Sequence, residues 1–131
     1  MAEERILDAE ALINGGRWAG AYYVAGYAVE CGLKACLLAQ MVRTGWVFQE
    51  RVKVEECRTH DFDELIRIAG LRSELDGSLA ASRAFAGNWG IVSQWKVSTR
   101  YEPKAEADAR AFYAAIADNP DGVLRWIQKY W

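Results

Sequence analysis

The clearest pattern of apolar and polar positions in this chain is a stripe of small residues between positions 19 and 41. Its members recur at alternating intervals of four and three residues, at Ala21, Ala25, Ala28, Gly32, Ala35 and Ala39. This spacing places them on one side of a helix, where small side chains allow a neighbouring helix to approach closely. We therefore predict one long helix over residues 19–41, with a core row formed by Tyr22, Val29, Leu33 and Leu37.

The remaining pattern also predicts helices and no pair of strands. Further helices are expected over residues 3–14, 61–69, 72–86, 103–117 and 123–131, and most are bounded by glycine or proline. Asp61 is expected to cap the helix over residues 61–69. Residues 45–59 are less regular, and residues 87–103 lack a helical period and predict an ordered loop. The expected fold is a single all-α domain over residues 1–131, an up-and-down bundle of four to five helices with one long central helix.

Charges within the long apolar helix argue against a membrane-spanning segment. Glu30 and Lys34 lie in its middle, and the uncharged run before Glu30 is shorter than the roughly 20 residues that a spanning helix needs. The first residues, Met1 to Glu4, have neither the basic flank nor the apolar core of a secretory signal. We therefore expect a cytoplasmic protein, in which Cys31, Cys36 and Cys57 are free and mostly buried thiols.

The composition restricts the classes of function. With 52% hydrophobic and 26% charged residues, the chain has the composition of an ordinary globular domain. A formal net charge of -2 argues against broad, sequence-blind coating of nucleic acid, which needs many basic residues, but it allows a local basic patch.

The acid and base of the long helix define a polar face, which contains Tyr23, Tyr27, Glu30 and Lys34. Glu30 precedes Lys34 by four residues, the favourable order for a helical ion pair. Three interpretations remain open: a structural ion pair, the seam of a dimer or partner complex, and a ligand site.

The stretch GRWAGAYYVAGYAVECGLKACLL, at residues 16–38, resembles the long second helix of the HEPN family, the higher eukaryotes and prokaryotes nucleotide-binding domain. Shorter supporting stretches are THDFDELIRIAG at 59–70, WKVSTRYEP at 95–103 and GVLRWIQKYW at the end of the chain. The resemblance spans essentially the whole chain. It implies a bundle of four or five helices that is usually dimeric and is often encoded beside a small nucleotidyltransferase. Several members of the family are RNA-cleaving toxins.

The nuclease members of that family carry an arginine, a polar residue, three or four others and then a histidine, and this chain departs from the pattern. Its only histidine is His60, none follows Arg100, and Arg58 stands two residues before His60. Cleavage of RNA without metal requires a general base and a general acid, and one histidine supplies both only across a dimer. His60 is more simply interpreted as part of the helix cap with Asp61. Cys57 and His60 lack the second pair of a zinc site, so we predict neither a metal nor a cofactor.

The segment from Arg83 to Lys104 is the candidate ligand surface. Basic and aromatic residues alternate there, and this combination is typical of phosphate contact with base stacking. The predicted ligand-binding residues are Arg100, Tyr101, Trp95, Lys96 and Lys104. Arg100 is the first candidate for contact with a phosphate or a partner carboxylate. In the alternative interpretation, the tryptophans fill the core beneath a long loop and the charges are solvated.

Six Trp and six Tyr residues are difficult to bury completely in one small helical domain, and Trp126, Tyr130 and Trp131 crowd the C-terminal end. An exposed aromatic patch is commonly a partner surface, so we expect a homodimer. The predicted function is a non-catalytic binding module that binds nucleotide or RNA, or docks on a separately encoded nucleotidyltransferase as in a toxin–antitoxin pair. The alternative is a metal-independent ribonuclease toxin with a degenerate site formed by His60, Arg58 and Arg100.

Overall fold

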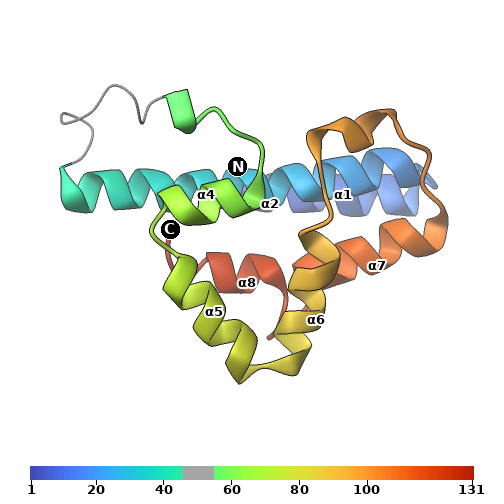
Figure 1. Cartoon of the computed structure of the whole chain (residues 1–131). Helices are drawn as coiled ribbons and strands as arrows, with labels where there is room; N and C mark the ends of the chain where they lie inside the picture. The colour runs from blue at the N-terminus through green and yellow to red at the C-terminus, as the bar shows by residue number, and fades with distance from the viewer. Residues whose placement is uncertain (46–54) are drawn as a thin grey trace.

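The computed structural model describes residues 1–45 and 55–131, and within these ranges the protein is a bundle of α-helices without a strand (Figure 1). The elements, in chain order, are α1 (Ala2–Asn14), α2 (Trp18–Thr44), α4 (Phe62–Ile68), α5 (Arg72–Ala81), α6 (Arg83–Val92), the 3₁₀ helix η2 (Val97–Tyr101), α7 (Glu106–Ala117) and α8 (Val123–Ile127). The predicted all-α fold with one long helix is therefore confirmed. Part of the expected irregular segment, residues 46–54, lies outside the described residues.

The long helix α2 is the element on which the others are assembled. Helices α1, α4, α7 and α8 and the 3₁₀ helix η2 all pack against it. Two of its glycines, Gly26 and Gly32, lie deep inside the helix, where each costs about 1 kcal/mol relative to alanine, and close packing is the compensation. At Gly26 the indole of Trp95 occupies the space that a Cβ would need, and a Cβ at Gly32 would lie 3.0 Å from the Cγ2 of Ile127. The glycines of α2 thus admit large side chains from other segments.

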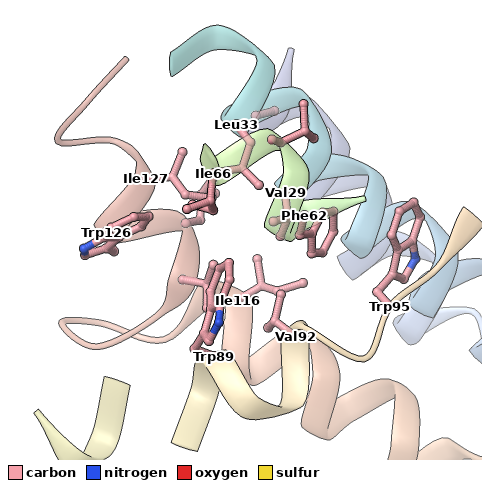
Figure 2. Packing of buried hydrophobic residues seen from close by; sticks show 14 of the residues in the cluster. Val29, Leu33, Phe62, Ile66, Trp89, Val92, Trp95, Ile116, Trp126 and Ile127 are labelled. Carbon is pink, nitrogen blue, oxygen red and sulfur yellow. The ribbon is translucent and has the colours of Figure 1, made fainter. Parts of the chain in front are cut away.

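The core lies between α2 and the shorter helices (Figure 2). Each of the helices α2, α4, α6, α7 and α8 contributes buried apolar side chains, and the segment before η2 adds Trp95. The labelled members in Figure 2 are Val29, Leu33, Phe62, Ile66, Trp89, Val92, Trp95, Ile116, Trp126 and Ile127. Burial of each large side chain of this kind contributes about 1.5 to 3 kcal/mol.

The region after Gly70 differs from the sequence-based expectation. One helix was expected over residues 72–86, but the structure has two, α5 and α6, with a break at Ser82. Ser82 has an extended backbone, with φ of -134° and ψ of 114°, and its Oγ accepts a hydrogen bond from the backbone N–H of Phe85 at 3.1 Å. Serine is among the favoured N-cap residues, so this cap starts a new helix. Helix α6 consequently extends into the expected loop over residues 87–103.

The ends of the other helices follow capping chemistry. Asp61 caps α4 as predicted, because its Oδ1 accepts a hydrogen bond from the backbone N–H of Glu64 at 2.9 Å. Helix α7 begins at Glu106 rather than at Pro103 or Lys104. None of the described helices combines the length and the apolar character needed to cross a membrane.

Candidate functional site

Glu30, in the middle of α2, is a buried carboxylate with two hydrogen-bond donors. Its side chain is 2% exposed, and its Oε1 lies 2.8 Å from the Nζ of Lys34 and 2.8 Å from the Nδ1 of His60. A carboxylate that is ionised can only accept hydrogen bonds, so Nδ1 of His60 is the protonated ring nitrogen in this contact. The predicted pair of Glu30 and Lys34 is therefore a cluster of three residues, and His60 reaches it from the turn before α4.

The carboxylate of the cluster is buried, whereas its two basic side chains are partly exposed to solvent. The side chains of Lys34 and His60 are 33% and 51% exposed. The second carboxylate oxygen of Glu30, Oε2, is buried and accepts no hydrogen bond from any described residue. Burial of a charged group costs several kcal/mol unless it is paired, so Glu30 depends on these two donors. The cluster holds the His60 ring against α2, the helix on which most other elements pack.

A pocket of about 330 Å³ lies beside His60, between the start of α4 and the segment that joins α6 to η2. Its lining residues are His60, Asp61, Phe62, Asp63, Ser93, Trp95, Lys96 and Val97. Since Nδ1 of His60 is engaged by Glu30, the opposite ring nitrogen, Nε2, is the one available to a ligand in this pocket.

The two acids of the pocket already have partners in the protein. Asp61 caps α4, and the Oδ1 of Asp63 lies 3.2 Å from an Nη of Arg72. The side chain of Lys96, in contrast, is exposed and makes no hydrogen bond or ion pair with any residue in the described ranges. The nitrogen groups that remain free to meet a ligand in the pocket are therefore Nζ of Lys96 and Nε2 of His60.

Of the predicted ligand-binding residues, Trp95 and Lys96 line this pocket, but Trp95 is mainly a core residue. It is 3% exposed, and its ring stacks on Phe62 with a centroid distance of 5.2 Å and an interplanar angle of 6°. The alternative interpretation of the tryptophans, that they fill the core, holds for Trp95 and for Trp89, which is 7% exposed. Trp95 forms part of the pocket wall and offers no open face for a base.

The other predicted ligand residues lie outside the pocket lining. Tyr101 is 77% exposed, and the guanidinium of Arg100 lies 4.7 Å from the centre of its ring. Lys104 lies over the ring of Tyr22 at 4.5 Å and pairs with Glu102 at 3.2 Å. The Arg100–Tyr101 pair is an exposed cation–aromatic surface, whereas Lys104 is occupied by contacts within the protein.

The residues of the alternative nuclease site are not brought together in one pocket. Nη1 of Arg58 lies 3.2 Å from Glu55 on the surface, and Arg100 lies over Tyr101. The interpretation of His60 as part of the helix cap is wrong, because Asp61 alone supplies the side-chain cap while the imidazole binds Glu30. Sequence analysis placed Glu30 and His60 on separate elements and had no signal for their contact.

The polar face predicted on α2 divides between the interior and the surface. Tyr23 is half-buried, with its ring 5.9 Å from that of Trp95, whereas Tyr27 is 37% exposed. Farther along α2, Leu38 and Val42 are 63% and 79% exposed. Beside them lies a groove of about 340 Å³ lined by Met1, Ala2, Glu3, Cys31, Ala35 and Trp131.

Burial disfavours the thiolate form of Cys36 and of Cys31. Cys36 is buried and donates a hydrogen bond from Sγ to the carbonyl oxygen of Ile127 at 3.5 Å. Burial raises the pKa of the Cys36 thiol to about 11, and burial also raises the pKa of Cys31. In residues 1–45 and 55–131, no group of three or more His, Cys, Asp or Glu side chains is placed to hold a metal ion.

Comparisons of the chain with protein-family models, with curated proteins and with solved structures found no match. The resemblance to the HEPN family stays a prediction from the sequence. The structure itself defines an all-α bundle in which a buried Glu–Lys–His cluster adjoins a pocket with two available cationic groups.

Proposed function

We propose that the protein is a non-catalytic binding module that holds a nucleotide or the end of an RNA by its phosphate group in the pocket beside His60. The observation that carries this proposal is that His60 and Lys96, which are distant in sequence, line the same pocket. Charge-assisted hydrogen bonds from such groups to phosphate oxygens are about twice as strong as neutral ones. A volume of about 330 Å³ lies at the small end of the range for ligand pockets and fits a mononucleotide or a terminal residue.

Binding is favoured over cleavage because His60 is the one imidazole among the described lining residues and both lining carboxylates are engaged within the protein. The two lining carboxylates cap α4 or pair with Arg72, and Arg58 and Arg100 have contacts elsewhere. General acid–base cleavage of RNA requires two groups that exchange protons with the reacting oxygens. The alternative function, a metal-independent ribonuclease, would need the second group from another copy of the chain.

We also propose that the exposed apolar end of α2 is the seam of a homodimer or the docking site of a nucleotidyltransferase. The supporting observation is the exposure of Leu38, Val42 and Trp131, which is 40% exposed. Contiguous apolar surface on a small domain is commonly covered by a partner.

Calorimetric titration tests the binding function directly, with adenosine 5′-monophosphate and adenosine as paired ligands. We expect the monophosphate to bind and adenosine to bind at least tenfold more weakly. Lys96→Ala should weaken monophosphate binding about tenfold, whereas Lys129→Ala, which removes an exposed lysine outside this pocket, should leave it unchanged. Equal affinity for both ligands, or absence of binding, would contradict the proposal. Metal-independent RNA cleavage that disappears in His60→Ala would favour the nuclease instead.

A further inference from the structure

We propose that Glu30 is a positioning residue for this pocket: its carboxylate holds the His60 ring with the proton on Nδ1 and presents Nε2 to a terminal phosphate monoester. The inference rests on the proposed function and adds to it the group that contacts the phosphate and the residue that orients that group. His60 is the ligand-contacting residue, and Glu30 acts only through it.

The geometry of the cluster sets the orientation of the ring. Oε1 of Glu30 lies 2.8 Å from Nδ1 of His60, and Glu30 belongs to α2, the helix on which most other elements pack. Which imidazole nitrogen carries the proton is set by the hydrogen bond that the other nitrogen does or does not make. The contact with Glu30 therefore assigns the proton to Nδ1 and leaves Nε2 as the exposed nitrogen. The same arrangement orients histidine ligands in many metal and catalytic sites.

Lys34 makes this arrangement more than a simple pair. Its Nζ lies 2.8 Å from the same Oε1, so the buried carboxylate has a cation that does not depend on the state of the imidazole. Consequently the charge of Glu30 is balanced without the imidazole, and in the complex an Nε2–H of His60 donates to a phosphate oxygen.

The charges around the pocket indicate one phosphate group rather than a nucleic-acid backbone. The charged groups near the imidazole are Glu30 and Lys34 from α2, Asp61 and Asp63 from the start of α4, and Lys96 from the segment before η2. A groove that follows a backbone requires a row of basic residues along its length. Here two cationic groups share the pocket lining with two carboxylates, so an extended polyanion would be repelled at its flanks. A terminal monoester, with a charge of about -1.5 to -2 near pH 7, matches two cationic groups at a single point.

A purely structural role for Glu30 makes a different prediction. If the cluster served only to fasten the turn before α4 onto α2, its loss would lower stability without changing how His60 responds to a ligand. The protonation state of the ring nitrogens separates the two roles.

The chain has a single histidine, so nitrogen-15 NMR of the imidazole reports on His60 alone. For the full chain without ligand we expect a proton on Nδ1. Addition of adenosine 5′-monophosphate should shift the Nε2 resonance, whereas adenosine should not. Glu30→Gln should abolish the preference for the Nδ1 proton and weaken binding of the monophosphate at least tenfold. Glu10→Gln, at an exposed position of α1, is the matched control and should change neither.

His60→Gln keeps the experiment decisive if Glu30→Gln fails to fold, because His60 is half-exposed and its replacement should leave the core intact. This variant should bind the monophosphate at least tenfold more weakly. A ring with its proton on Nε2 and none on Nδ1 in the free protein, or unchanged monophosphate binding in His60→Gln, would overturn this inference while the proposed binding function stands. Failure of the unmodified protein to bind the monophosphate would overturn the binding function together with the phosphate contact proposed here.

Discussion

The middle and the C-terminal end of α2 depart from the usual distribution of side chains in opposite directions. In the middle, the carboxylate of Glu30 is 2% exposed, although charged residues are rarely buried unless they are paired. Toward the end, Leu38 and Val42 are 63% and 79% exposed. A buried charge and exposed apolar side chains both lower the stability of the isolated chain. Each region therefore indicates which kind of group α2 contacts there. The buried charge contacts a pocket residue of the same chain, and the exposed apolar end is the seam proposed above.

The largest expected effect tests how tightly the middle of α2 is packed. Gly26→Ala should lower the free energy of unfolding by about 3 kcal/mol, because the indole of Trp95 occupies the place of the new methyl group. Chemical denaturation measures this change. Gly87→Ala in α6 is the control: nothing lies within 4 Å of the added Cβ, so that variant should be as stable as the original protein or up to about 1 kcal/mol more stable. Equal effects of the two substitutions would refute the close contact with Trp95.

A second test uses the burial of Cys36, which lies on α2 between the two regions. Burial raises the pKa of this thiol to about 11, so the unfolded chain releases the proton first as pH rises above about 9. The free energy of unfolding should therefore fall by about 2 to 3 kcal/mol between pH 9 and pH 11. The contribution of the neutral Cys36 thiol to the free energy of unfolding is present below pH 9 and is lost as the pH rises to 11. Denaturation curves of Cys36→Ala should lack this part of the fall, and identical pH profiles would show that the thiol is not held neutral.

A third test compares two helical ion pairs with the same spacing. Lys34→Met should destabilise the protein by about 2 kcal/mol, because it removes one of the two donors to the buried carboxylate of Glu30. Arg110→Met breaks the ion pair with Glu106. The side chains of Arg110 and Glu106 are 54% and 55% exposed, so the free energy of unfolding should fall by about 0.5 kcal/mol or less. Thermal unfolding of both variants provides the measurement. Equal costs would mean that Glu30 does not depend on Lys34.

The smallest effect on stability is expected at the exposed end of α2. Val42→Lys should change the free energy of unfolding by less than about 0.5 kcal/mol, since the valine is 79% exposed. It should, however, abolish self-association measured by sedimentation velocity, because a charge at an apolar seam is not solvated there. The matched control is Leu7→Lys, which places the same charge at a 63% exposed position on α1. Association that survives Val42→Lys would remove this end of α2 from the proposed seam.

The helices of this fold were largely predictable because they depend on local rules. The period of the apolar residues located α1, α2 and α7, and Asp61 was recognised as a cap. The break between α5 and α6 was missed, although Ser82 is a favoured cap residue, because the apolar pattern continues across it.

The candidate site was less predictable, since it is formed by contacts that are distant in sequence. Glu30 and His60 are 30 residues apart, and neither position has a periodic pattern that indicates the other. Trp95 was assigned to a binding surface because basic residues surround it in the sequence. The same sequence pattern occurs around a tryptophan of the core and around a tryptophan that stacks on a base. Only the packing against Gly26 and Phe62 distinguishes these two environments.

The contact between Gly26 and Trp95 also constrains how relatives of this chain can diverge. A side chain at position 26 requires Trp95 to shift or to be replaced by a smaller residue, so a change at one position favours a change at the other. Because Trp95 is also a wall of the pocket, such a paired exchange would enlarge the pocket. The width of the pocket is therefore linked to the absence of a side chain at position 26 of α2.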